Sequence, residues 1–172
     1  WRPKCRKACH VWTFAWTLLT SLCVLAALLT SGKQAVTLLS LTTNLTISFK
    51  LDGLGRLFSG MVAILWPLAT LYAFEYMEHA ERQKAFFMFF TMTYGVTLGI
   101  AFASDMLTLY FFYELLTLVT VPLVMHSLTR EAILAVRKYL YFSIGGAAFA
   151  LMGMIFVMVY GTTCEFRLGG IF

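Results

Sequence analysis

Five long apolar runs constrain the fold of this chain more than any other feature of its sequence. They cover residues 11–30, 57–74, 85–104, 106–127 and 139–163. Each is about 18–25 residues long, the length that an α-helix needs to cross a hydrocarbon core of roughly 30 Å. Helices of a soluble bundle carry a polar face at helical spacing, and these runs carry almost none. The sequence therefore predicts an all-α, polytopic transmembrane bundle of five helices, with residues 1–172 as a single membrane region.

The composition agrees with a chain that lies within a membrane. Hydrophobic residues make up 60% of it and charged residues 12%, against about 45–50% and roughly 25% in ordinary globular domains. The net charge of +5 would suit nucleic-acid binding in a soluble protein, but in a membrane protein basic residues gather in the loops that stay in the cytoplasm. We therefore expect the lipid bilayer, and no nucleic acid, as a partner.

The basic residues also orient the predicted helices, because the loops between helices alternate sides of the membrane. One set of loops carries nine: Arg2, Lys4, Arg6, Lys7, Arg82, Lys84, Arg130, Arg137 and Lys138. The other set carries four: Lys33, Lys50, Arg56 and Arg167. The richer side is expected to be cytoplasmic, or the equivalent compartment, which places the N-terminus inside and the C-terminus outside.

The outer connections predict local structure at one end of the bundle. Residues 31–52 form the one long connection, and their alternating, β-branched pattern permits a small hairpin. Asp52 can cap the second helix. The pair Ser104-Asp105 leaves room only for a tight turn. The third and fourth helices must therefore be antiparallel neighbours, with one of these two residues capping the fourth.

Three further segments predict local features of the helices and of the link between the last two. Pro67 lies within the second run and should kink it. Residues 128–137 form an inner link that is typical of a surface helix. Small residues four apart in the last run allow close approach of a neighbouring helix. They are the pairs Ser143/Ala147 and Gly146/Ala150.

The four cysteines show no metal-binding pattern. Cys5 and Cys9 are four apart, Cys23 lies in an apolar run and Cys164 follows the last one. No Cys-x-x-Cys or Cys/His spacing suggests zinc or an iron–sulfur cluster. We interpret them as ordinary reduced thiols, and we expect no metal and no cofactor in this chain.

Glu114 is the one charged residue inside the five runs, with histidine counted as neutral. It lies nine residues past Asp105, about 13.5 Å into the core at 1.5 Å per residue, and therefore near the bilayer midplane. A carboxylate at that depth costs at least about 2.5–3.5 kcal/mol. Such a group faces the protein interior, acquires a cationic partner or takes up a proton. All three outcomes suit a protein that handles protons.

Hydroxyl groups surround Glu114 at helical spacing. Tyr110 lies four residues before Glu114, Tyr113 is adjacent to it, and Thr117 lies three residues after it. Hydroxyls around a buried carboxylate can satisfy it or hold a chain of water. The alternative is that Glu114 is a structural hydrogen-bonding residue between helices.

Three more residues extend this candidate site toward the inner side. Pro122 removes a backbone donor and clashes with the carbonyl of Leu118, which opens the helix near the level of Glu114. His126 closes the inner end and could pass protons to the interface, although interfacial histidines are common. Lys138 opens the last helix and is a possible charge partner in this site, although on local evidence a lysine that extends to the interface is the simpler interpretation.

Three segments together resemble a known family. They are Phe49–Phe58, with its Asp-Gly-Leu motif, Ala103–Leu116, which carries the glutamate, and Ala135–Tyr141, which precedes a glycine-rich helix. In order and spacing they are similar to the antiporter-like subunits of respiratory complex I, whose relatives include Mrp-type cation/proton antiporters and membrane-bound hydrogenases. The resemblance covers residues 49–161.

The resemblance implies roles for individual residues. Glu114 would be the carboxylate that works with a lysine on a later helix, and Lys138 would match a basic residue at the start of the sixth family helix. The five helices would be family helices two to six. Such subunits have more helices, and this chain begins at Trp1 without methionine, so we expect a fragment or a truncated relative that pairs with other membrane subunits.

The function that follows is a membrane-arm subunit, or a fragment of one, in a redox-driven or antiporter-type complex that moves protons or sodium ions. Within complex I it would be a non-redox subunit of a translocating NADH:quinone oxidoreductase, without a redox centre of its own. We expect it in the bacterial cytoplasmic membrane or an energy-transducing organelle membrane. The alternative is a structural or assembly subunit without its own ion path. A small-solute transporter would show an inverted repeat, and the five runs show none.

Overall fold

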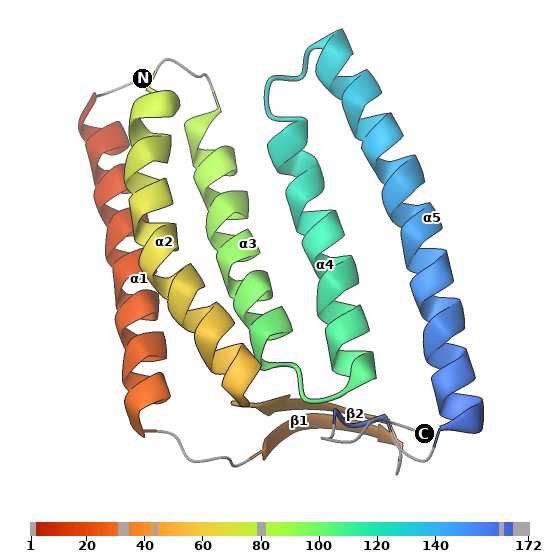
Figure 1. Cartoon of the computed structure of the whole chain (residues 1–172). Coiled ribbons are helices and arrows are strands. Elements are labelled where there is room, and N and C mark those ends of the chain that lie inside the picture. The colour runs from red at the N-terminus through yellow and green to blue at the C-terminus, as the bar shows by residue number, and fades with distance from the viewer. Residues whose placement is uncertain (1–2, 31–34, 43–44, 79–81, 162–163, 167–172) are drawn as a thin grey trace.

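The computed structural model describes residues 3–30, 35–42, 45–78, 82–161 and 164–166. Five long helices dominate it, and all five are long and apolar enough to cross a membrane. Their bounds are α1 Pro3–Thr30, α2 Gly53–Tyr76, α3 Gln83–Phe102, α4 Met106–Val124 and α5 Arg130–Tyr160. A two-stranded sheet, β1 Ala35–Thr42 and β2 Leu45–Lys50, completes the fold (Figure 1). The predicted five-helix architecture is confirmed.

Successive helices run antiparallel, and the hairpin lies across the end where α2 and α4 begin (Figure 1). The first helix starts at one end of the bundle and the last helix finishes at the other. A chain with an odd number of spans must have this arrangement. Which end faces the cytoplasm remains a prediction from the loop charges.

The last helix differs from the sequence-based expectation. A separate surface helix was expected in residues 128–137, before a span over residues 139–163, but α5 is one continuous helix from Arg130. Thr129 caps it by accepting a hydrogen bond from the amide of Ala132 at 3.1 Å. No proline or glycine interrupts the first half of α5, and Arg137 and Lys138 are good helix formers. The charged segment therefore continues the helix instead of ending it.

The predicted hairpin is confirmed and is attached to the helices through Asp105. The strands pair antiparallel, from Ala35 opposite Lys50. Asp105, which is 4% exposed, caps α4 by accepting from the Thr108 amide at 2.7 Å. Its carboxylate also accepts from the Thr108 hydroxyl at 2.9 Å and from the Ser48 hydroxyl on β2 at 2.6 Å. These hydrogen bonds join β2 to the turn between α3 and α4. We call Ser48, Asp105 and Thr108 the polar lock.

Asp52 caps α2, as predicted, and accepts from the amide of Gly55 at 2.6 Å. Pro67 lies inside this helix, and α2 changes direction between its two halves (Figure 1). The bend agrees with the predicted kink, because proline removes a backbone hydrogen bond and clashes with the preceding turn.

Two clusters form the core among α1, α2 and α3. The larger centres on the buried ring of Tyr94, which stacks on Trp66 and whose hydroxyl bonds Ser21 at 2.8 Å. The smaller one surrounds Phe87 and Met77. The helices α3 and α4 approach closely through a glycine contact that is described below.

Candidate functional site

The fourth helix places Glu114 at the middle of its length. α4 begins at Met106, behind the Asp105 cap, and ends at Val124. Glu114 is therefore about 13.5 Å from the cap and about 15 Å from the end of the helix at 1.5 Å per residue. The depth expected from the sequence agrees with these helix bounds.

The carboxylate of Glu114 is left without a hydrogen bond. The side chain as a whole is half-buried, but its Oε1 atom is buried and no described residue donates to it. Asp105, at the N-cap of the same helix, accepts four hydrogen bonds, the longest from Ser104 at 3.5 Å. One oxygen of the Glu114 carboxylate, by contrast, is removed from solvent without a hydrogen-bond donor in the described residues. The geometry does not supply the interhelical hydrogen bond that a purely structural glutamate would make.

Next to Glu114, hydroxyl groups form two bonded pairs across the interface of α4 and α5. Thr117 Oγ1 lies 3.1 Å from Ser143 Oγ. One turn further along α4, Thr120 Oγ1 lies 2.8 Å from the Tyr139 hydroxyl. We call Thr117, Thr120, Tyr139 and Ser143 the hydroxyl row. Residues three apart share a helix face, so Thr117 brings the row to the face of α4 that carries Glu114.

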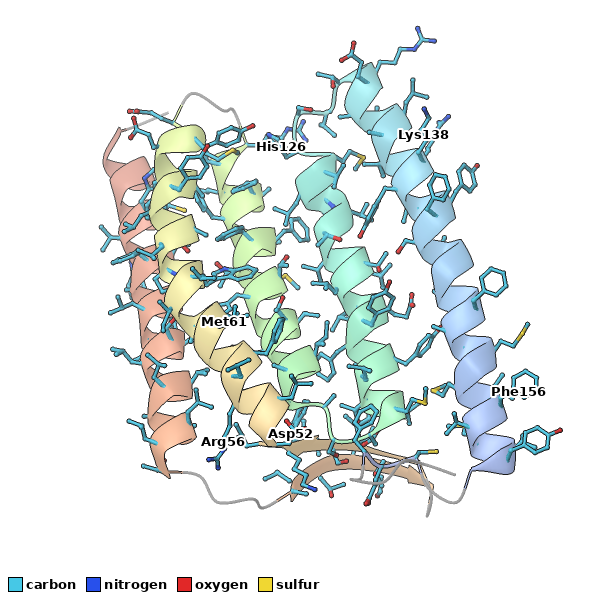
Figure 2. The ribbon with its side chains drawn as sticks, in the orientation of Figure 1. Asp52, Arg56, Met61, His126, Lys138 and Phe156 are labelled. Carbon is cyan, nitrogen blue, oxygen red and sulfur yellow. The ribbon has the colours of Figure 1, made fainter. Side chains whose placement is uncertain are left out.

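The row also fixes the register of the two helices. Since Thr117 faces Ser143 in an antiparallel pair, Glu114 lies level with about residue 146, and Lys138 lies level with about Pro122. Pro122, and with it the level of Lys138, is eight residues past Glu114 on α4, or about 12 Å along the helix axis. Lys138 is exposed, and in the described part of the chain it makes no ion pair with Glu114. Figure 2 shows it on α5, toward the same end as His126 and away from Asp52 and Arg56.

His126 lies outside the hydroxyl row. Its Nδ1 is 3.0 Å from the carbonyl oxygen of Leu123, and its ring meets Phe86 of α3 edge-on at 5.8 Å. It is twelve residues past Glu114, about 18 Å along the helix axis. Pro122 lies within α4, which continues to Val124.

The two tyrosines near Glu114 occupy different environments. Tyr110, one turn before Glu114, is half-buried. Tyr113 is 46% exposed and contributes its backbone carbonyl to Thr117, at 3.4 Å. In the part of the chain that the structure describes, no three His, Cys, Asp or Glu side chains are grouped so as to hold a metal.

Comparison with known proteins agrees with this architecture. The family described as NADH-Ubiquinone oxidoreductase (complex I), chain 5 N-terminus, matches residues 38–87. The Na(+)/H(+) antiporter subunit A1 of Staphylococcus aureus, in strains JH9 and Newman, is 29% identical over 110 residues, which are 63% of this chain and 14% of the relative. The chain is a homologue of the antiporter-like membrane subunits of complex I and the Mrp antiporters. The resemblance found in the sequence is thereby confirmed.

A solved structure supports the fold of this antiporter-like chain. A chain in the membrane-bound sulfane sulfur reductase, an archaeal respiratory membrane complex, superposes with a TM-score of 0.75 at 19% identity. The superposition covers 96% of our chain and 34% of that one. At this identity the likeness shows the fold alone. The chain also spans only 14% of the length of the antiporter relatives, and the complex I match ends in α3, before Glu114.

Sequence reasoning missed two members of the hydroxyl row in this antiporter-like chain. Ser143 was interpreted as a small packing residue, and Tyr139 was assigned no role, although Ser143 faces Thr117 and Tyr139 faces Thr120. The available signal was their spacing. Two hydroxyl side chains four residues apart in an otherwise apolar span share one face, and polar groups inside a membrane usually seek a partner helix.

Proposed function

We propose that this chain is a membrane-arm subunit, or part of one, in a redox-driven or antiporter-type complex that translocates protons or sodium ions. In this proposal Glu114 is the group that takes up and releases a proton. The antiporter relatives and the complex I family suggest the class of complex. Its partners would be other membrane subunits.

The observation that carries the proposal is the unbonded carboxylate of Glu114 at the middle of α4. In this proposal a positive charge that approaches Glu114 favours loss of the proton, and its departure favours uptake of one. Such a group can change its occupancy in response to a charge that moves elsewhere in the complex. The Asp105 carboxylate, by contrast, is held in place by four hydrogen bonds.

We also propose which end of the helical bundle faces the cytoplasm. The end that carries Arg82, Lys84, Arg130, Arg137 and Lys138 would face the cytoplasm or the equivalent compartment, because basic residues are retained there. Lys138 would modulate charge at that end of α5, and His126 would serve as a separate proton acceptor at the same end. The hairpin would then lie on the outer surface.

The test is Glu114→Gln in the assembled complex, with ion translocation measured in sealed vesicles. We expect translocation to fall by about a hundredfold or more, the lower end of the usual contribution of a proton-transfer group. The matched control is Glu75→Gln, which removes an exposed carboxylate from α2 and should leave translocation unchanged. Full translocation by Glu114→Gln, in a complex that assembles normally, would contradict the proposal. Normal assembly is part of the expected result, since Glu114 bonds no other described residue.

A further inference from the structure

We infer that the hydroxyl row is the route by which Glu114 exchanges its proton with the end of the bundle where α5 begins. This inference rests on the proposed function of Glu114 and assigns roles to Tyr139 and Ser143. The row begins one turn from Glu114, with Thr117, and ends with the pair of Thr120 and Tyr139.

The row covers about 9 Å of the roughly 15 Å between Glu114 and the end of α4. Thr120 lies six residues past Glu114, about 9 Å along α4, and Val124 ends the helix about 6 Å further on. From the register set by the two bonded pairs, the first turns of α5 project beyond the end of α4, and Figure 1 shows the same arrangement. Tyr139 is level with Thr120, about one helical turn before the last residue of α4.

Hydroxyl groups can relay a proton without becoming a stable ion. Each hydroxyl accepts a proton on its oxygen and passes its own proton to the next group, so that no atom is gained or lost. The two pairs are one helical turn apart, about 5 Å. Transfer between the two pairs would use one bridging water, which needs two to four polar partners.

The hydrogen bonds within the row leave protons free to move. Thr117 points to the carbonyl of Tyr113 at 3.4 Å, a length at which a hydrogen bond is weak, so its proton is available to Ser143. The hydroxyl of Thr120 has carbonyl acceptors at 2.9 and 3.0 Å in α4. Tyr139 therefore donates to Thr120 in the resting arrangement, and passage of a proton requires the Thr120 hydroxyl to rotate.

The opposite direction offers no comparable route within the described residues of α4. The hydroxyl nearest that end, Thr108, donates to Asp105 and accepts from the amide of Ser48 at 3.0 Å. Above it, the rings of Phe49 and Phe112 pack with their centroids 5.4 Å apart. Thr108 serves the polar lock, and among the described residues Tyr110 forms no hydroxyl pair like those of the hydroxyl row. The bonded hydroxyl pairs therefore lead from Glu114 toward the start of α5.

The experiment measures proton exchange at Glu114 directly in the assembled complex. The infrared carboxyl band that disappears in Glu114→Gln is followed after a rapid change of pH, in Tyr139→Phe and in Thr117→Val. We expect both variants to slow the exchange by about tenfold or more. Tyr141→Phe is the matched control, because Tyr141 is 77% exposed on the same helix. It should exchange at the unaltered rate.

Thr117→Ser separates loss of the hydroxyl group from a change in helix packing. It keeps the hydroxyl while losing a methyl group, so it should restore the exchange rate that Thr117→Val lacks. Exchange at the unaltered rate in both Tyr139→Phe and Thr117→Val would overturn the route. The role of Glu114 would still stand in that case, provided that Glu114→Gln abolishes translocation. Equal slowing in Thr117→Ser and Thr117→Val would also overturn it, because packing would then explain the effect.

Discussion

At the scale of single residues, two carboxylates nine positions apart on one helix have opposite environments. Asp105 accepts hydrogen bonds from Ser48 and from both donors of Thr108, whereas Glu114 Oε1 is buried without a donor. The hydrogen bonds of Asp105 join the α3–α4 turn to the hairpin, whereas Glu114 makes no such structural bond with the described residues. Asp105 therefore holds the fold together, and Glu114 is the carboxyl group to which the proposed function assigns the proton.

Loss of the Asp105 carboxylate should therefore affect stability. Asp105→Ala removes the helix cap and leaves Ser48 and Thr108 without their acceptor, and we expect it to lower the free energy of unfolding by roughly 1.5–3 kcal/mol. Asp52→Ala, which removes a more exposed cap with one donor, should cost only about 1 kcal/mol. Thermal unfolding of the purified complex in detergent compares the two. Equal losses of unfolding free energy in Asp105→Ala and Asp52→Ala would show that the hydrogen bonds from Asp105 to the hairpin do not contribute to stability.

At the scale of helices, the packing of α3 on α4 depends on one glycine. A Cβ atom on Gly99 would overlap the ring of Phe112, whereas one on Gly95, a turn earlier on α3, would meet nothing within 4 Å. The close approach therefore requires the absence of a side chain at Gly99 alone. This contact holds α4, and with it Glu114, against the first three helices.

The two glycines form a matched pair for mutation. Gly99→Ala should destabilise the protein by about 1–3 kcal/mol, the usual cost of overpacking. Gly95→Ala should be neutral or slightly stabilising, because alanine is the better helix former. The unfolding temperatures of the two variants give the comparison. A Gly99→Ala protein as stable as Gly95→Ala would mean that α4 can move away from α3 without cost.

The sequence predicted the elements better than their contacts. The spans followed from the length of the apolar runs, the hairpin from alternation in residues 31–52, and the caps from Asp52 and Asp105. The face that α5 turns toward α4 could not be predicted in the same way, because helices in lipid are apolar on all sides and lack the polar face that orients a soluble helix. The pairing of Thr120 with Tyr139 became visible only in the structure.

At the scale of the whole molecule, the two ends of the bundle differ. The hairpin and the Asp105 lock lie at one end. The other end carries the described basic residues Arg82, before α3, and Arg130 and Lys138, in the first part of α5. Large apolar side chains on α5, among them Phe142 and Phe149, are 83% and 76% exposed. In a membrane these surfaces face lipid or neighbouring helices.

The predicted orientation can be tested by cysteine labelling. Ser127→Cys and Ser40→Cys, each in a chain whose four cysteines are replaced by serine, place an exposed thiol at opposite ends. A membrane-impermeant reagent should label the Ser127 site from the cytoplasmic side and the Ser40 site from the outer side. Labelling in the reverse sense would contradict the orientation.

The most direct test of the central claim is to follow the protonation of Glu114 during turnover. Infrared difference spectra of the assembled complex, with the Glu114→Gln variant identifying the band, report whether the carboxyl gains and loses a proton when ion transport is driven and then inhibited. We predict that the Glu114 band changes in step with transport. A Glu114 carboxyl that keeps one protonation state, while ions move at the normal rate, would contradict its role as the proton-handling group.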